Sequence, residues 1–376
     1  MYQSPDIIII TCFAAYEPRV DLIKKYYNNN EKNVLIISTD YLHREKRYRK
    51  DCELKKDYLY IPTVPYKQNL SLKRLLSHYI FAKRAFKYIK TLNPKEIYVL
   101  IPCNSLAKFA ARYKNEYKCK LILDIIDLWP ESLPFGDIKK YWPLCLWRGL
   151  RDNNLKYADS IITECDLYQK SLIEKCHNVA IKTVYWPQTD YRNIHSHVLT
   201  QDEVQFLYLG SINHIIDIDT IIKMLTAINK VKRISIHIIG DGEQRLTFLE
   251  QLSKYSLKFY YYGTIYDDYK ICEIASLCSW SINIMKQSVN VGLTMKSVSY
   301  MALGLPIINN LRGDTWEFVE NFNIGINLDN NFYEIIECPI NKIREMGINS
   351  RKIYMLKFSS DAFFSQLENA LENHMR

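Results

Sequence analysis

The sequence lacks the marks of several common protein classes. Its ten cysteines include no Cys-x-x-Cys pair, which argues against a structural zinc site and a disulfide framework. The longest apolar run near the start, Ile7–Ala15, contains Thr11 and is far shorter than the roughly 20 residues of a membrane-spanning helix. The first six residues carry no basic charge, so we expect no signal peptide, reduced thiols and a cytoplasmic location.

Glycine and proline are also scarce, with 11 and 12 residues in a chain of 376. This composition excludes a low-complexity chain, and the 48% of hydrophobic residues is enough for two cores. A chain of this length predicts two domains of roughly 150–200 residues each. We place the domains at 1–190 and 191–358, followed by an amphipathic tail helix at 359–376.

The excess of positive over negative charge lies in the first half. Residues 1–190 carry 32 Lys and Arg against 21 Asp and Glu, whereas the remainder carries 18 against 20. This asymmetry indicates an anionic partner or surface for the first half, or serves solubility alone. Leu70–Leu92 and 139–148 combine basic and apolar residues, so each can lie on an anionic membrane or pack one face on a sheet. The cations of the first segment are Lys73, Arg74, Lys83, Arg84, Lys87 and Lys90.

Short apolar runs alternate with longer amphipathic segments in both halves. Runs of four to six apolar residues without polar alternation are typical of strands buried on both faces of a parallel sheet. The sequence therefore predicts two doubly wound α/β domains with ligands at the carboxyl ends of the strands. The expected strands are Ile7–Ile10, Val34–Ser38, Tyr58–Ile61, Ile97–Ile101 and Leu121–Ile126, then Val204–Leu209, Ile234–Ile239, Lys258–Tyr262, Trp280–Ile284 and Pro306–Asn309.

Glycines follow two of the predicted strands in the second half. Gly240 and Gly242 separate a strand from a helix, and Gly210 ends an earlier strand. Glycine lets the backbone approach a phosphate closely at a helix N-terminus, or simply makes a tight turn. Asp217 and Asp219 match a metal-binding D-x-D pattern, but an Asp at the start of a helix is expected to act as a cap.

The segment 292–309 is the most informative part of the second half. Thr294 is expected to cap a helix that ends before Gly304, with a buried strand after Pro306. A helix N-terminus can bind a diphosphate through its free N–H groups, and Lys296 in the first turn adds a positive charge. A lysine there opposes the helix dipole, which favours an anion nearby; the alternative is a solvated side chain.

Two carboxylates occupy the corresponding place in the first half. Asp127 follows the predicted strand that ends at Ile126, and Glu131 lies one turn later. A carboxylate at the carboxyl end of a buried strand can hydrogen-bond a sugar or accept a hydroxyl proton. The alternative is a cap or a loop-stabilising role. Asp124, within the strand, is expected to have a structural partner.

Motifs in both halves resemble those of glycosyltransferase family 4 enzymes, which build bacterial surface polysaccharides. The first half contains DIIDLWPES, similar to the D-x-x-D-x-W-P-E-S segment of that family. The second half carries, in the order of the family, YLGSI, IIGDGEQR, YYGTI, GLTMKSVSYMALGLPIINN and GDTWEFV. The resemblance extends from Asp124 to Asn327.

The resemblance implies a GT-B fold, in which two Rossmann-like domains face an interdomain cleft and the tail helix crosses back to the first domain. The donor nucleotide sugar would bind the second domain and the acceptor the first. Members need no bound metal, so no cofactor is expected, and they retain the anomeric configuration. By analogy, the base would be contacted by Gly263, Thr264 and Ile265. The diphosphate would be held by Gly210, Ser211, Thr294, Met295 and Lys296. The rest of the donor site would consist of Asn213, Gly240, Gly242 and Ser299.

The sequence also departs from the family pattern. The Arg and Lys that usually follow the Gly-Ser strand are replaced by Asn213 and His214, and the next cation is Lys223. The paired glutamates of the family correspond to Val291 and Ser299. One of these glutamates normally holds the ribose hydroxyls, so their absence motivates alternatives to a simple transferase.

We therefore expect a hexosyltransferase-type enzyme that passes a sugar from a nucleotide sugar to a lipid-linked saccharide at the inner face of the membrane. Capsular polysaccharide, lipopolysaccharide and exopolysaccharide are the products that the resemblance implies. Because the family histidine of the first domain has no clear counterpart, Asp127 is assigned to the acceptor, with Glu131 beside it. The alternatives are a catalytically weak GT-B subunit that binds a partner transferase, and a nucleotide-sugar epimerase. No recognised nucleic-acid-binding motif is present.

Overall fold

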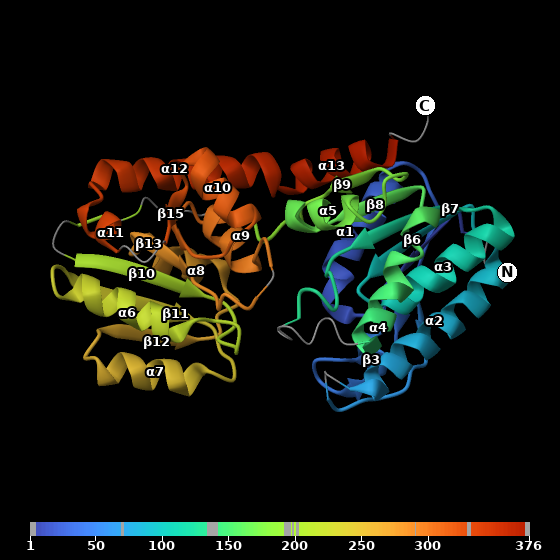
Figure 1. Ribbon diagram of the computed structural model, residues 1–376, viewed down its shortest axis with the longest axis horizontal. Helices are drawn as coiled ribbons and strands as arrows, with labels where there is room; N and C mark the ends of the chain where they lie inside the picture. The colour runs from blue at the N-terminus through green and yellow to red at the C-terminus, as the bar shows by residue number, and fades with distance from the viewer. Residues whose placement is uncertain are drawn as a thin grey trace. The chain divides into compact units, whose positions relative to one another are not determined.

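The computed structural model of the protein describes residues 5–68, 71–133, 142–191, 197, 199–200, 203–289, 291–328 and 332–372. The chain forms two compact units, residues 1–184 with 364–376 and residues 185–363 (Figure 1). Within the described ranges, no helix is long and apolar enough to span a bilayer. The basic segment 139–148 lies partly outside these ranges.

The first unit contains a parallel sheet in which, over the described residues, seven strands are ordered β5-β2-β1-β6-β7-β8-β9. The inner strand β1 consists of four isoleucines, all buried, because helices cover both faces of the sheet. The edge strand β5 is only partly buried. The strands are β1 (Ile7–Ile10), β2 (Val34–Thr39), β5 (Tyr58–Ile61), β6 (Glu96–Ile101), β7 (Lys120–Ile125), β8 (Ser160–Thr163) and β9 (Ile181–Thr183), with a separate hairpin of β3 (Tyr41–Leu42) and β4 (Arg47–Tyr48).

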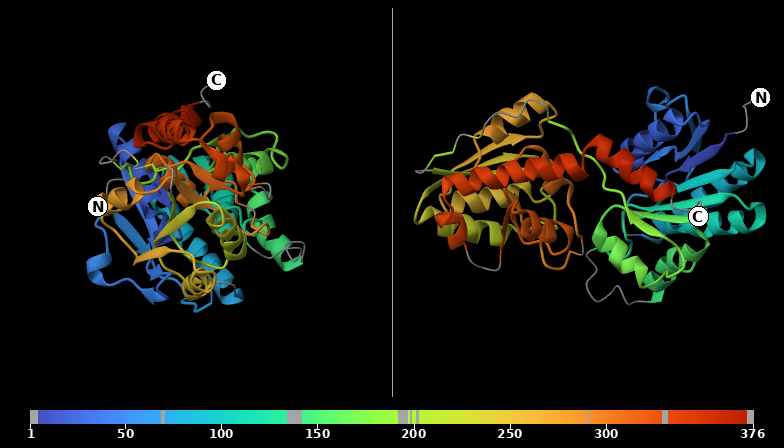
Figure 2. Two further views of the ribbon diagram at one scale, coloured as in Figure 1. Left: turned by 90° about the vertical axis from the view of Figure 1, so that its left-hand side faces the viewer. Right: turned by 90° about the horizontal axis from the view of Figure 1, so that it is seen from above.

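Helices α2, α3 and α4 of the first unit pack in succession, α3 against both of its neighbours (Figure 2). The C-terminal helix α13 also packs on this unit from Phe364 onward. Ser160 donates its hydroxyl to the Ala370 carbonyl at 3.0 Å, and the Lys25 ammonium lies 5.6 Å from the centre of the Phe364 ring. The helices are α1 (Glu17–Asn29), α2 (Leu72–Leu92), α3 (Asn104–Tyr117), α4 (Trp142–Asp152), α5 (Asp166–Ile173) and α13 (Ser360–Glu372).

The second unit repeats the doubly wound plan with the strand order β12-β11-β10-β13-β14-β15 in its described part. Figure 1 shows α10 and α12 at the top of this unit, near β15, and α7 at its lower end, next to β12. The strands are β10 (Glu203–Leu209), β11 (Arg233–Ile239), β12 (Phe259–Gly263), β13 (Trp280–Asn283), β14 (Ile307–Asn309) and β15 (Gly325–Asn327). The helices are α6 (Ile218–Asn229), α7 (Arg245–Lys254), α8 (Asp268–Ser276), α9 (Met295–Ala302), α10 (Asp314–Phe322), α11 (Tyr333–Glu337) and α12 (Ile340–Lys357).

The predicted α/β fold class is confirmed, and each expected strand is present with bounds that agree to within one residue. Asp217 caps α6, accepting the Thr220 N–H at 3.0 Å, as the capping interpretation predicted. Strands β8, β9 and β15 and the hairpin of β3 and β4 were not predicted. The cleft expected between the two domains stays a prediction.

The point where the chain reverses its strand order lies between β10 and β13. These strands pair only at Phe206–Leu207, whereas β10 pairs with β11 along its whole length. Tyr300 of α9 bridges the diverging ends: its hydroxyl accepts the Leu209 N–H at 3.0 Å and donates to the Ile282 carbonyl at 3.1 Å. Strand reversal points of this kind are where open α/β sheets bind their ligands.

A buried ion pair anchors the first sheet. The fully buried guanidinium of Arg19 donates to both carboxylate oxygens of Asp124, at 2.8 and 3.1 Å, and to the Val184 carbonyl at 3.1 Å. The Tyr98 hydroxyl donates to the same carboxylate at 2.8 Å. The structural partner expected for Asp124 is therefore confirmed.

We predict that Arg19→Met lowers the free energy of unfolding by about 3–5 kcal/mol, because it leaves the Asp124 charge buried without its cation. Urea denaturation measures this loss. The control is Lys24→Met, which removes the more exposed pair with Asp57 and should cost less than about 1 kcal/mol. Equal losses in the two variants would contradict an anchoring role for Arg19.

Candidate functional site

Glycine loops meet at the carboxyl end of the second sheet without room for side chains. A Cβ atom on Gly240 would lie 2.0 Å from the Gly210 carbonyl oxygen, and one on Gly242 would lie 2.3 Å from the Ile212 carbonyl oxygen. The φ angles of Gly210 and Gly240 are +119° and +145°, which also disfavours any side chain. Gly240 donates its N–H to the Gly263 carbonyl at 2.8 Å. These contacts explain Gly240 and Gly242 by close backbone packing.

The loop between β11 and α7 already contains its own anion. The Asp241 carboxylate accepts the Gly242 N–H at 2.7 Å and the Arg245 guanidinium at 3.4 Å. The helix predicted after Gly242 is α7, which begins at Arg245. A phosphate at this loop would compete with Asp241, so donor contacts from Gly240 and Gly242 stay predictions.

Lys296 lies directly over the backbone of Gly210. A Cβ atom on Gly210 would stand 3.1 Å from Cε of Lys296. Any side chain at position 210 would therefore crowd the stem of the lysine. The Lys296 ammonium contacts the Tyr208 hydroxyl and lies 4.3 Å from the centre of the Tyr208 ring. The Tyr208 hydroxyl donates to the Ser211 carbonyl at 2.8 Å, which leaves its oxygen free to accept from the lysine.

The charge of Lys296 lacks an acidic partner in the described part of the chain. Burial lowers the pKa of Lys296 to about 7, and no carboxylate opposes this effect. A cation withdrawn from water is stabilised when a negative group comes close. A diphosphate placed beside Gly210 and Lys296 would supply that negative group.

Side chains from the neighbouring strands fix the N-terminus of α9. The Thr294 hydroxyl accepts the Ser297 N–H at 3.0 Å and donates to the Asn283 side chain at 2.9 Å. Asn283 donates its amide to Asn309, and Asn309 donates to Asn327, both at 2.8 Å. The cap predicted at Thr294 is confirmed, and an asparagine ladder across β13, β14 and β15 holds it in place.

The remaining residues predicted around α9 have varied surroundings. Met295 accepts a hydrogen bond at its sulfur from the Gln188 amide at 2.8 Å. Val291 packs against the core of the second unit, and Ser299 is partly exposed on α9. Donor contacts from Met295 and Ser299 stay predictions.

The loops predicted to contact the donor are accessible. Ser211 and Thr264 are exposed, whereas Asn213 and Ile265 are partly buried. Gly263 has a φ of +68°, and no atom lies within 4 Å of the place where its Cβ would stand. The Asn213 side chain accepts an N–H from its own loop at 3.2 Å, so it shapes the loop. Contacts of these residues with a donor stay predictions.

In the first unit, Asp127 follows β7 and accepts the Tyr16 hydroxyl at 2.5 Å. Burial raises the pKa of Asp127 to about 6, although the Tyr16 hydrogen bond and the charge of Arg74 oppose the rise. A carboxylate with this pKa is ionised at neutral pH and takes up a proton more readily than an ordinary Asp.

A cluster of aromatic and basic residues lies in the first unit around Phe13. The Arg74 guanidinium is 4.4 Å from the Trp129 ring centre and 5.5 Å from that of Phe13. The ring of His78 is 5.2 Å from Phe13, and burial followed by the charge of Arg74 holds the pKa of His78 well below its usual value. Burial and Arg74 likewise lower the pKa of His43 to about 4. Grouping Arg74 with the surface cations of α2 was wrong, because it is buried among these rings.

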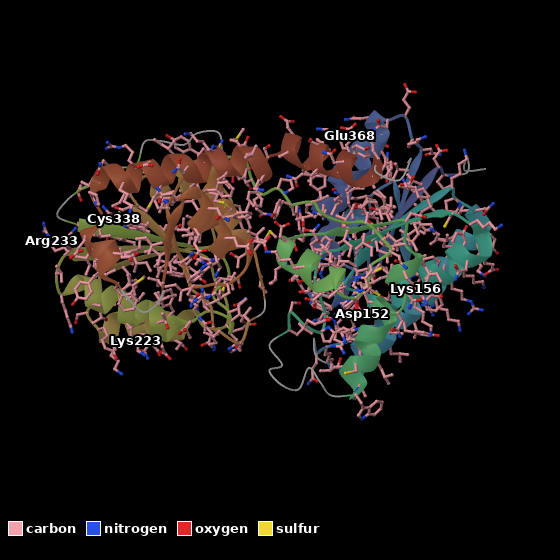
Figure 3. All side chains as sticks on the ribbon, turned by 45° about the horizontal axis from the view of Figure 1, so that its top comes forward. Asp152, Lys156, Lys223, Arg233, Cys338 and Glu368 are labelled. Carbon is pink, nitrogen blue, oxygen red and sulfur yellow. The ribbon has the colours of Figure 1, made fainter. Side chains whose placement is uncertain are left out.

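Glu131 is part of an ion-pair cluster. Arg151 and Lys175 lie 2.7 and 3.0 Å from its carboxylate. Asp152, labelled in Figure 3, pairs with the same two cations at 2.7 and 3.1 Å. Burial raises the pKa of Glu131, but Arg151 and Lys175 outweigh this and lower it. These contacts agree with the loop-stabilising alternative, so Asp127 is the better placed of the two to accept a proton.

Several residues of these sites were not identified from the sequence. Tyr16 and Tyr208 act through hydroxyls that meet partners distant in the chain. The sequence indicates the asparagine ladder only weakly: Asn283 and Asn309 are polar residues at the ends of two mainly apolar strands. No spacing rule connects them before the strand order is known.

The fold is similar to that of solved glycosyltransferase structures. Sucrose-phosphate synthase from Thermosynechococcus elongatus matches with a TM-score of 0.71 and 12% identity, over 96% of this chain and 97% of that one. The lipopolysaccharide outer core galactosyltransferase WaaB matches with a TM-score of 0.70 and 14% identity, over 98% and 99%. HepE from Anabaena, solved with UDP and glucose, matches with a TM-score of 0.66 and 14% identity, over 98% and 100%.

A scan against protein-family models and a search of the curated proteins found no match. The structural likeness covers nearly the whole chain, and at this level of identity it concerns the fold. The two doubly wound sheets agree with that likeness. The protein therefore has the GT-B fold of these glycosyltransferases, built from two Rossmann-like units.

Proposed function

We propose that the protein is a glycosyltransferase that moves a sugar from a nucleotide-sugar donor to a saccharide acceptor. Lys296 carries this proposal, because its stem lies over the Gly210 backbone at the start of α9 and its ammonium has a neutral phenol as its partner. A nucleoside diphosphate supplies the negative charge that this place lacks. The structure of HepE with UDP-glucose supports the same class of ligand on a similar fold.

The second unit would stabilise the nucleoside diphosphate as it leaves. The N–H groups of Met295 and Lys296 belong to the first turn of α9, where N–H groups have no partner within the helix. The Thr294 cap and the asparagine ladder fix this turn before any substrate binds. Donors held in advance stabilise developing charge without reorganising. We propose that they and the Lys296 ammonium act without a metal ion.

On the acceptor side, Asp127 would accept the proton of the attacking hydroxyl. Its place after β7 and its raised pKa support this role. We extend the proposal to a transfer that retains anomeric configuration, onto a lipid-linked saccharide in surface polysaccharide synthesis. Support for this extension comes from the motifs between Asp124 and Asn327 and from the likeness to WaaB.

A second candidate is a GT-B subunit that binds nucleotide but needs a partner for turnover. The observation that favours it is Val291, which packs in the core of the second unit where the resemblance would place a glutamate. A structure of the GtfA/B complex is among the similar folds, with a TM-score of 0.58 and 12% identity over 78% of this chain. Nucleotide binding without transfer by the purified chain would favour this candidate.

We predict that nucleoside diphosphate binding weakens as pH rises from 7 to 9. Lys296 titrates at a pKa of about 7 in the free protein, and a bound diphosphate favours its charged form and raises that pKa. Binding then takes up a proton, so affinity falls by up to about tenfold per pH unit above 7. Calorimetry, with the nucleoside diphosphate that stabilises the protein most in a thermal-shift panel, measures this dependence.

Two variants test whether Lys296 is responsible. Lys296→Met should bind roughly 10- to 100-fold more weakly at pH 7, because a charge-assisted contact is lost, and its affinity should be flat from pH 7 to 9. The control Lys223→Met changes an exposed lysine of α6 (Figure 3) and should behave as the unchanged protein. Wild-type affinity in Lys296→Met would overturn the assignment.

We predict that transfer activity rises with pH through about 6, as Asp127 ionises. Asp127→Asn should lower the turnover rate by about 100-fold or more, because it removes the proton acceptor. Tyr16→Phe should move the acid limb to higher pH, since the Tyr16 hydrogen bond lowers the Asp127 pKa. Release of nucleoside diphosphate measures the pH profile, and Tyr117→Phe, exposed on α3, serves as the control. Full activity in Asp127→Asn would exclude this role.

A further inference from the structure

Basic side chains from two elements of the first unit converge on one aromatic ring. The turn between β3 and β4 supplies Lys46, whose ammonium lies 4.8 Å from the centre of the Tyr66 ring. The first turn of α2 supplies Arg74, whose guanidinium lies 5.9 Å from the centre of the same ring. Two cations therefore share one ring, although like charges at this range repel each other.

The effect of this convergence is visible at His43, which belongs to the same turn as Lys46. The His43 ring lies 4.8 Å from the Phe13 ring, and burial lowers the pKa of His43 to about 4. The charges of Arg74, Arg44 and Lys46 act in the same direction. Burial and then Arg74 also lower the pKa of Lys46. A negative group among these bases would relieve their repulsion.

We refer to His43, Arg44, Lys46 and Arg74 as the basic cluster. Two other cations of the β3–β4 segment have acidic partners instead. Arg47 pairs with Glu45 and Glu53, and Arg49 pairs with Glu17. These three carboxylates are therefore engaged by cations outside the basic cluster.

A buried histidine of α2 has unused hydrogen-bonding groups beside the basic cluster. His78 is 2% exposed, and its ring lies 5.2 Å from the Phe13 ring. Neither of its ring nitrogens makes a hydrogen bond among the described residues. A neutral imidazole has one donor and one acceptor nitrogen, and leaving both unpaired in the interior is unfavourable. A polar ligand beside Phe13 would supply the missing partner.

The basic cluster lies at the carboxyl end of the first sheet, near Asp127. Phe13 follows β1 and Trp129 follows β7, and the Arg74 guanidinium lies 5.5 and 4.4 Å from the centres of their rings. The Phe13 ring also contacts the ring of Tyr16 at 5.7 Å, and Tyr16 donates to Asp127. Arg74 is close enough for its charge to oppose the rise in the Asp127 pKa. A saccharide with a hydroxyl at Asp127 would therefore extend toward the basic cluster.

We propose that the acceptor saccharide carries a negatively charged group, a carboxylate or a phosphate, which binds the basic cluster while a hydroxyl lies at Asp127. A guanidinium presents its N–H groups in a planar fork that matches both kinds of anion. The negative charge would offset the repulsion among the four bases, which a neutral saccharide could not do. The proposal rests on the transferase function and adds to it the chemical class of the acceptor.

Three sugars that differ only at carbon 6 test this selection. Glucuronate carries a carboxylate there, glucose 6-phosphate carries a phosphate, and glucose carries a neutral hydroxyl. We titrate each sugar into the full chain by calorimetry, with saturating nucleoside diphosphate to fill the donor site. At least one charged sugar should bind on the order of tenfold more tightly than glucose, and the tighter one identifies the kind of anion. Equal affinities for all three sugars, or no binding of any, would overturn the proposal.

Two variants assign the preference to the basic cluster. Arg74→Met should lower the affinity for the charged sugar by about tenfold and leave the affinity for glucose unchanged. Lys46→Met, which changes a half-buried residue of the turn, should act in the same direction and decides the matter if Arg74→Met fails to fold. The control Lys83→Met changes an exposed lysine of α2 and should bind all three sugars as the unchanged protein does. A charge preference that survives in Lys46→Met and in folded Arg74→Met would contradict the assigned site.

Nucleoside diphosphate affinity, measured in parallel, separates this proposal from the transferase proposal. It should be the same in Arg74→Met, Lys46→Met and the unchanged protein. Nucleotide binding without a preference for charged sugars would overturn the charged acceptor alone. Absence of nucleotide binding would count against the transferase, whereas a preference for charged sugars that both variants lose would still support the anion site.

Discussion

The Gly210 carbonyl oxygen occupies the place where a Cβ atom on Gly240 would stand, and the donor side of the second unit depends on this close approach. It brings the ends of β10 and β11 together and leaves the Gly210 backbone bare. The stem of Lys296 uses that bare surface to reach Tyr208. The Tyr300 hydroxyl closes the other side, between β10 and β13. A side chain at either glycine would separate the loops and move the lysine from the start of α9.

Each unit contains one ionisable side chain whose pKa is shifted toward neutrality, an acid in the first unit and a base in the second. In the first unit, Arg19 neutralises Asp124, whereas Asp127 accepts a phenol hydroxyl and has a raised pKa. In the second unit, Lys296 meets a phenol and has a lowered pKa. Groups whose pKa values are moved toward neutrality in this way are typical of functional sites. The proposed transfer uses both, one to accept a proton and the other to hold the leaving diphosphate.

The sequence predicted the strands and the Thr294 cap because both follow from local patterns, namely apolar runs and a capping residue before a helix. It could not predict partners that depend on strand order, such as the contact of Tyr16 with Asp127. It misplaced Arg74, because helical periodicity does not reveal that aromatic rings surround a cation. It also could not predict that Arg151 is buried in α4, because its partner Glu131 lies on a loop elsewhere in the fold.

The central claim is that the second unit holds a nucleoside diphosphate at the start of α9. A crystal structure of the protein with the nucleoside diphosphate that binds it best tests this claim most directly. The account predicts phosphate oxygens at the Lys296 ammonium and at the first N–H groups of α9, above the Gly210 backbone. Phosphates bound elsewhere, with Lys296 still on the Tyr208 hydroxyl, would contradict it.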